Sequence, residues 1–258
     1  MLRLPKEHGA WAMLYVPFIL GILVAGSCPW QLVLLWVAIT ALFIGRDALQ
    51  NWSDARRRGQ PSSEGTRALI YAAISLLAGA PLVLVYRIPG MVPSALLAGL
   101  IIWRHHLQTR RRQGRTIAGE FISIAGITIS GPVAHHVASG SVETIAALIW
   151  FLSLLYFASS VFYVKQRVLA TQPRRSDEYR EIARASATYH AAVVVIMLAV
   201  VLGGVASWWG LLAFAPAVIR ATWYLLWPSP VLNLVRVGVL EIVYSLIFLV
   251  CAWQGLMR

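Results

Sequence analysis

One polar stretch, DALQNWSDARRR, follows a long apolar segment and carries the residues best suited to chemistry. Asp47, Asn51 and Asp54 are spaced by four and three residues, so on a helix they fall on one face. Carboxylate and amide oxygens are the ligands that a hydrated divalent cation prefers. Alternatively, the two carboxylates pair with the flanking Arg46 and Arg58, as ion pairs at a helix end commonly do.

A second group of polar residues lies in the segment FYVKQRV. Lys165 and Arg167 alternate just beyond an apolar run, and Tyr163 precedes them. Arginine offers a bidentate fork to phosphate oxygens, and lysine offers a point charge. We therefore predict that Tyr163, Lys165 and Arg167 contact a phosphate, a diphosphate or another anion.

A third group lies at the N-terminus, where LPKEHGAWAML places Lys6, Glu7 and His8 directly before an apolar run. The plain interpretation is a membrane anchor, with Trp11 at the interface, where its ring is favoured. The alternative is a lid over a shared pocket. Glu7 and His8 would then act as acid or base, since histidine titrates near neutral pH, and Lys6 would meet an anionic head group.

The composition sets the context for these groups. Of 258 residues, 59% are hydrophobic and 12% are charged, about half the charged fraction of a soluble domain. Many apolar runs approach 20 residues, enough to cross a hydrocarbon layer of about 30 Å. The runs are continuous and not alternating, which argues against a barrel. We expect an all-α, polytopic membrane bundle, with the first span retained because no cleavage pattern follows it.

About nine transmembrane helices are predicted, within a single integral membrane domain over 1–258. Turn signals such as SCPW, RIPGMVP and WPSP separate them. The predicted spans are Trp11–Gly26, Trp30–Leu49, Arg67–Tyr86, Met91–Trp103, Ile117–Val137, Thr144–Val164, Tyr189–Ala206, Trp208–Leu226 and Val231–Gly255.

The basic residues predict the orientation. With the N-terminus in the cytoplasm, 20 of the 22 Lys and Arg residues fall inside, and only Arg87 and Arg258 fall outside. The formal net charge of +12 therefore reflects topology and contact with anionic membrane lipids, and we predict no nucleic-acid partner. The long polar loops are all on the inner side, so we expect function to face the cytoplasm.

Ionisable residues within the spans are costly and usually face a partner or a cavity. We expect Glu120 to pair near Arg104 or Arg115, and Glu241 to pair across helices. The pair His135-His136 lacks a third ligand at metal-binding spacing. The two cysteines show no metal spacing and suggest no disulfide.

The number of spans and the polar loops after spans two and six resemble the UbiA-type intramembrane prenyltransferase superfamily. Those enzymes bind an isoprenyl diphosphate through magnesium, using N-D-x-x-D-x-x-x-D after the second helix and D-x-x-x-D after the sixth. In QNWSDARRR, Gln50, Asn51, Asp54 and Arg58 take the four positions of the first motif. The resemblance implies Mg²⁺ near Asp54, but only one of its three carboxylates is present, and FYVKQRV stands where the second motif is expected.

A resemblance over almost the whole chain is to the YwiC-like family of bacterial membrane proteins. It rests on PKEHGAW at the start, GEFISIAGITISGPVAHH in the fifth span and FASSVFYVKQR at the end of the sixth. It implies a multi-pass protein of the bacterial inner membrane and carries no established activity. Likeness in architecture to the prenyltransferases bears on fold, and fold does not fix function.

Two classes of function remain open. The first is an enzyme acting on an isoprenoid diphosphate. Lys165, Arg167 and Arg58 would clamp the diphosphate, Asp47 and Asp54 would hold one Mg²⁺, and Asp54, Glu7 and His8 would serve catalysis. Substrate contacts would come from Lys6, Asn51 and Tyr163. The second class is a non-catalytic permease or lipid-binding protein, in which the same basic groups bind an anion.

Overall fold

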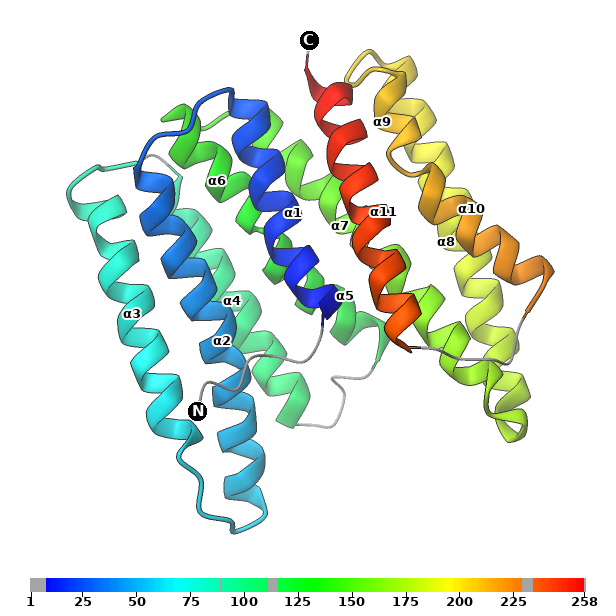
Figure 1. Cartoon of the computed structure of the whole chain (residues 1–258), viewed down its shortest axis with the longest axis horizontal. Helices are drawn as coiled ribbons and strands as arrows, with labels where there is room; N and C mark the ends of the chain where they lie inside the picture. Colours follow the sequence, from blue (N-terminus) through cyan, green and yellow to red (C-terminus); the bar gives the residue numbers. More distant parts are fainter. Residues whose placement is uncertain (1–7, 89, 111–115, 229–233, 258) are drawn as a thin grey trace.

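The computed structural model describes residues 8–88, 90–110, 116–228 and 234–257, and these residues form an all-helical bundle without strands (Figure 1). The order is α1 (His8–Ala25), α2 (Gln31–Arg57), α3 (Glu64–Leu84), α4 (Met91–Arg110), α5 (Ile117–Thr128), α6 (Ser130–Ser139), α7 (Thr144–Ala170), a 3₁₀ turn (Pro173–Arg175), α8 (Ser176–Leu202), α9 (Trp208–Leu212), α10 (Ala215–Leu226) and α11 (Leu234–Leu256).

The prediction of an all-α polytopic membrane protein is confirmed. Seven of the described helical segments are long and apolar enough to cross a membrane, and two shorter apolar helices, Gly9–Ala25 and Met91–Ile101, accompany them. Each predicted span corresponds to one of these segments. Several helices extend beyond the predicted spans: α2, α4 and α7 run on at their C-terminal ends, and α8 starts earlier, so their polar sequences are helical.

The fifth and eighth spans, predicted as continuous, are each interrupted. The first break, at Ile129, lies between α5 and α6, and the second, after Leu212, lies between α9 and α10. Proline has no N–H for the carbonyl four residues earlier. Pro132 thus leaves the carbonyl of Thr128 without its helical partner, and Pro216 does the same to Leu212. Each break therefore follows directly after the residue whose carbonyl lacks its helical hydrogen bond.

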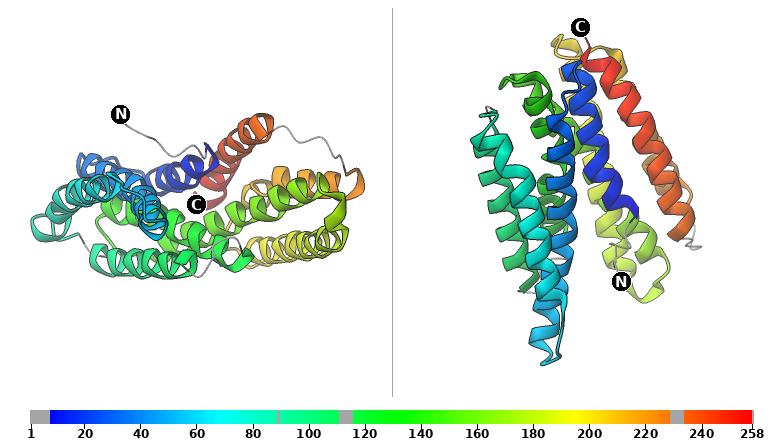
Figure 2. Two further views of the ribbon diagram at one scale, coloured as in Figure 1. Left: turned by 90° about the horizontal axis from the view of Figure 1, so that it is seen from below. Right: turned by 60° about the vertical axis from the view of Figure 1, so that its left-hand side comes forward.

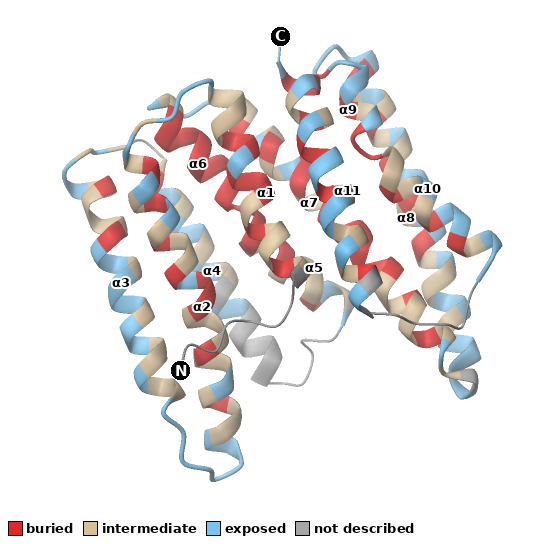
Figure 3. Ribbon diagram, in the orientation of Figure 1, coloured by how far each residue is buried: buried red, intermediate tan, exposed pale blue. Residues whose placement is uncertain are grey.

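Helix α1 is at the centre of the packing. It contacts α6, α5 and α7 on one side and α11 on another, and buried residues concentrate on α1, α6 and α7 (Figure 3). A Cβ on Gly21 would lie 2.2 Å from the carbonyl oxygen of Gly131, so the two backbones meet where neither residue has a side chain. Ser130 also donates a hydrogen bond from α6 to the carbonyl of Leu14, at 2.7 Å.

The loops divide the bundle into two ends. One end, called the basic end here, holds the α7–α8 turn and the α2–α3 turn, and the latter carries Arg56, Arg57 and Arg58 (Figure 1). The far end holds Arg87 and the C-terminal end of α11. Viewed along the helices, the bundle is elongated in cross-section (Figure 2). The one-sided distribution of basic loops is thus present in three dimensions for the described residues.

The α1–α6 contact yields a stability prediction. Gly21→Ala places a methyl group against the α6 backbone, and we expect a loss of about 1–3 kcal/mol, as overpacking typically costs. Gly99→Ala on α4 is the control, because a Cβ there meets nothing within 4 Å. Thermal unfolding in detergent measures both variants. Equal unfolding temperatures for the two variants would contradict the close approach.

Candidate functional site

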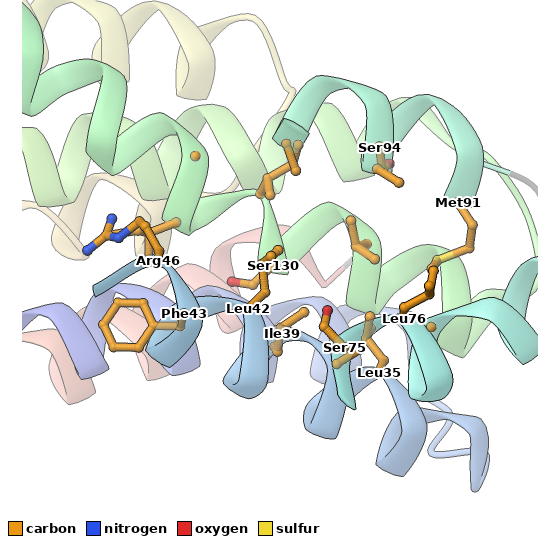
Figure 4. A pocket seen from close by; sticks show the side chains of 18 of the residues that line it. Leu35, Ile39, Leu42, Phe43, Arg46, Ser75, Leu76, Met91, Ser94 and Ser130 are labelled. Carbon is orange, nitrogen blue, oxygen red and sulfur yellow. The ribbon is translucent and has the colours of Figure 1, made fainter. Parts of the chain in front are cut away.

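A cavity of about 600 Å³ lies among helices α1 to α6. Its walls come from α2 and α3 on one side and from α4, α5 and α6 on the other, with Leu14 of α1 contributing (Figure 4). Almost all of the lining is apolar. The polar exceptions are four serines and one charged residue, Arg46.

The cavity exists because its walls pack in separate pairs. Helix α3 packs along α2, and α4 packs along α5, whereas α3 and α4 make few contacts with each other. Within the first pair, Gly45 faces Tyr71 closely, and within the second, Ile101 lies against Gly126. Small residues thus draw each pair together and leave space between the pairs.

The cavity opens sideways, at the surface of α3. Leu76 and Leu84 line it, yet these side chains of α3 are 70% and 72% exposed. A residue that both lines a cavity and remains exposed lies at its mouth. In a membrane such a mouth faces hydrocarbon, so an apolar molecule can enter without passing through water.

Arg46 marks the polar end of the cavity. It lies 15 residues along α2 from Gln31, or about 22 Å from the far end of the helix at about 1.5 Å per residue. One guanidinium nitrogen of Arg46 donates to the hydroxyl of Ser123 at 3.2 Å, and its carbon lies 5.3 Å from the centre of the Phe43 ring. Figure 4 shows Arg46 beside Phe43 at one end and Met91 at the other.

A salt bridge lies one helical turn from Ser123. Glu120 on α5 accepts Lys165 of α7, with 2.7 Å between Oε1 and Nζ. Glu120 is therefore paired, as predicted, but its described partner is Lys165 and not Arg104. Arg115 lies outside the described residues. Arg46, Ser123, Glu120 and Lys165 connect α2, α5 and α7 toward the basic end.

The predicted acidic face of α2 does not point into the cavity. At about 100° per residue, the face of Asp47, Asn51 and Asp54 lies about 120° around the helix from the face of Leu42 and Arg46. Asn51 donates to Asp47 at 3.3 Å. In the described part of the chain, no three His, Cys, Asp or Glu residues form a metal-binding group.

The predicted cationic clamp is divided between distant helices. Arg58 donates to the backbone carbonyl of Asp54 at 3.2 Å, at the exposed end of α2. Arg167, on α7, stacks over the Tyr224 ring at 4.9 Å, and Tyr163 contacts the same ring at 5.9 Å. Helices α2 and α7 do not pack against each other, and their C-terminal ends lie at opposite sides of the bundle (Figure 1), so the structure does not bring these two halves together.

The N-terminal group is only partly visible. Lys6 and Glu7 lie outside the described residues, and of His8 only the backbone is described, as the first residue of α1. Trp11 packs against Phe43, with ring centres 4.9 Å apart. The start of α1 therefore lies beside the part of α2 that carries Arg46, which agrees with a position near the polar end of the cavity.

The position of Arg46 in the wall of a cavity was not predicted. The sequence pattern indicates Arg46 only as a pairing partner for the acidic face of α2. The signal was present, because Arg46 is a charged residue still within an apolar helical run, and such residues usually face a cavity or a partner. The serines carried no comparable signal, since serine is common in membrane helices and only packing shows which ones face a cavity.

The salt bridge between α5 and α7 generates a second prediction. Lys165→Ala leaves the half-buried carboxylate of Glu120 without this partner, so we expect a larger loss of stability than in the double variant Lys165→Ala/Glu120→Ala. The coupling energy should be about 0.5–3 kcal/mol. Unfolding of the four members of the cycle in detergent measures it. Additive effects would show that the pair contributes no coupling.

Comparisons with known proteins identify the family of the chain. A family model described as YwiC-like protein matches residues 4–135, a segment that contains every residue lining the cavity. "Uncharacterized protein YwiC" of Bacillus subtilis (strain 168) is 28% identical over 252 residues, which cover 95% of each chain. No solved structure matches the chain. The chain belongs to the YwiC-like family.

Proposed function

We propose that this protein binds a single-chain isoprenoid lipid with a phosphate or diphosphate head group. The chain occupies the cavity among α1 to α6, and the head group contacts Arg46. The observation that carries the proposal is the combination of an apolar, laterally open cavity with one guanidinium at its basic end. A cavity for a soluble metabolite would carry several convergent polar groups.

The size of the cavity favours one chain. A water molecule occupies about 30 Å³ in the liquid, so 600 Å³ accommodates about 20 groups of that size. That is the scale of one short isoprenoid chain. Burying such a chain contributes about 0.8 kcal/mol per methylene group, although lipid offers a similar environment, so the head group must supply much of the selectivity.

Arg46 suits a phosphate head group. A guanidinium presents five N–H donors in a planar fork that matches phosphate oxygens. Held by Ser123 and by the Phe43 ring, Arg46 keeps its orientation, so little rotamer entropy is lost when an anion binds. At about 22 Å along α2, it also lies near the basic-side boundary of the hydrocarbon layer.

Binding is favoured over prenyl transfer. Transfer of the UbiA type needs carboxylates that hold magnesium against the diphosphate, and the face of Asp47 and Asp54 is turned away from the cavity. Mg²⁺ is often bound by one or two carboxylates together with water molecules, and Asp47 and Asp54 could supply such ligands. Because they lie on another face of α2, a metal ion held there would not face the cavity. The proposal places the basic end in the cytoplasm of a bacterial cell, with the bundle in the inner membrane.

The head-group contact can be tested by titration. Purified protein in detergent is titrated with farnesyl diphosphate, with and without Mg²⁺. We expect Arg46→Ala to weaken binding about tenfold to a hundredfold, since a charge-assisted hydrogen bond contributes about 1.5–3 kcal/mol. Arg57→Ala, at the exposed end of the same helix, is the control and should bind like wild type. No saturable binding by wild type would overturn the proposal.

The chain contact has its own test. Ala98→Trp fills the cavity from α4 and should abolish binding of farnesyl diphosphate, whereas direct binding of inorganic diphosphate, which needs only the head-group contact, should be unchanged. Leu77→Trp, on the lipid-facing side of α3 and outside the lining, is the matched control. Equal affinities for the two tryptophan variants would show that the chain binds elsewhere.

A further inference from the structure

The hairpin of α2 and α3 extends farther from the basic end of the bundle than any other described segment (Figure 1, Figure 2). Its tip, defined here as residues 52–65, lies beyond the cavity. Arg57 follows Arg46 by 11 residues on α2, which is about 16 Å at about 1.5 Å per residue. The tip is therefore separate from the head-group contact proposed for Arg46.

The backbone of the tip is fixed by its turn and by one indole ring. Gly59 has a positive φ of 65°, which glycine adopts most readily, and the N–H of Gln60 donates to the carbonyl of Ala55 at 3.0 Å. This pattern closes the C-terminal end of α2. The ring of Trp52 packs on Gly65 of α3 so closely that a Cβ there would lie 2.8 Å from Nε1. Side chains on the tip are thus presented from a defined backbone.

Three consecutive arginines, Arg56, Arg57 and Arg58, are exposed on this tip. Arg56 lies over the Trp52 ring, with its guanidinium carbon 5.4 Å from the ring centre. Nε of Arg58 donates to the backbone carbonyl of Asp54 at 3.2 Å. Within the described residues, none of the three arginines forms an ion pair with a carboxylate. The tip therefore carries a concentrated positive charge that no ion pair neutralises in this part of the chain.

Several basic side chains elsewhere are arranged differently. Five Lys or Arg residues of the described chain pair with carboxylates, in Arg67–Glu64, Lys165–Glu120, Arg175–Glu178, Arg180–Asp177 and Arg220–Glu241. The last of these pairs confirms the prediction that Glu241 pairs across helices. Membrane orientation requires basic residues on one side, but it does not require three of them without carboxylate partners on one projecting turn.

Anionic lipid head groups are poor partners for the tip, because the tip reaches past them. The apolar run of α2 ends at Ile44, next to Arg46, and head groups extend about 5–8 Å beyond the hydrocarbon layer. Arg57 lies about 16 Å beyond Arg46 along α2. The remaining gap is about one Debye length, roughly 8 Å at physiological ionic strength, so the attraction of the lipid surface is largely screened at the tip.

Nucleic acid is also a poor partner for the tip. Proteins that bind double-stranded DNA make about 6–10 phosphate contacts, whereas the three arginines lie on a single helical turn. Proteins that bind single strands add exposed aromatic rings on which the bases stack. The ring of Trp52 does not offer such a surface, because Gly65 packs against it and Arg56 lies over it.

We propose that the α2–α3 tip docks an acidic segment of a water-soluble protein at the basic end of the bundle. Each guanidinium offers a planar fork of N–H donors that matches a carboxylate. Arginine clusters are a recurrent means of recognising acidic segments. A segment with three or more neighbouring Asp or Glu residues supplies the complementary charge. Because α2 carries both Arg46 and the tip, the docked protein lies next to the polar end of the cavity.

Binding of a fluorescein-labelled octaglutamate peptide tests the proposal. The purified full chain is placed in nanodiscs of neutral phosphatidylcholine, and fluorescence anisotropy is recorded at about 0.15 M salt. Wild type should bind the peptide saturably. The variant Arg56→Gln/Arg57→Gln/Arg58→Gln should bind it about tenfold more weakly, as expected from the loss of three exposed charge pairs.

The matched control removes the same charge from the other basic turn. Arg174→Gln/Arg180→Gln/Arg184→Gln changes exposed positions near the α7–α8 turn and should bind the peptide like wild type. The proposal is overturned if wild type shows no saturable binding or if both triple variants lose affinity equally, since binding would then follow overall charge. It is also overturned if an oligothymidine strand or vesicles of phosphatidylglycerol bind the tip more tightly than the peptide does, which would assign the tip to nucleic acid or to lipid.

Discussion

The close approach of α1 and α6 is the contact on which the rest of the architecture depends. Gly21 and Gly131 meet backbone to backbone, where a single methyl group would clash. This places α1 in the middle of the bundle, against α5, α6 and α7 and beside α11. With the α6 surface partly occupied by α1, the α2–α3 pair stands apart from the α4–α5 pair, and the cavity is the space that remains between them.

The two halves of the bundle stabilise their buried arginines in different ways. In the cavity half, Arg46 is supported by a hydroxyl and a ring and faces a space that an anion can enter. In the other half, Arg220 is paired with the carboxylate of Glu241 and lies over the ring of Tyr163. A charge that lines a cavity can bind an anion, whereas the charges of an enclosed ion pair are neutralised within the bundle.

The sequence predicted the elements better than the site. Apolar runs identified every apolar helical segment of the described chain, but not the breaks that divide the fifth and eighth spans. Pro132 and Pro216 are the signals for those two breaks, because proline lacks the N–H that a continuous helix needs. The cross-helix pairing of Glu241 followed from the cost of an unpaired charge in lipid. The cavity could not be predicted from the sequence. It depends on how closely neighbouring helices approach at small residues such as Gly21 and Gly45, and the sequence does not show which neighbour each of these residues meets. For the same reason Lys165 and Arg58 are predicted to form one clamp, although α2 and α7 do not pack against each other.

The central claim is that an isoprenoid chain occupies the cavity among α1 to α6. Photocrosslinking measures this most directly, using an isoprenoid diphosphate with a photoreactive group near the end of its chain, followed by mass spectrometry of the labelled peptides. The account predicts labels on lining segments of α2 and α4, removed by excess unlabelled ligand. Labels spread over the lipid-facing surfaces of α8 and α10, unaffected by competition, would contradict it.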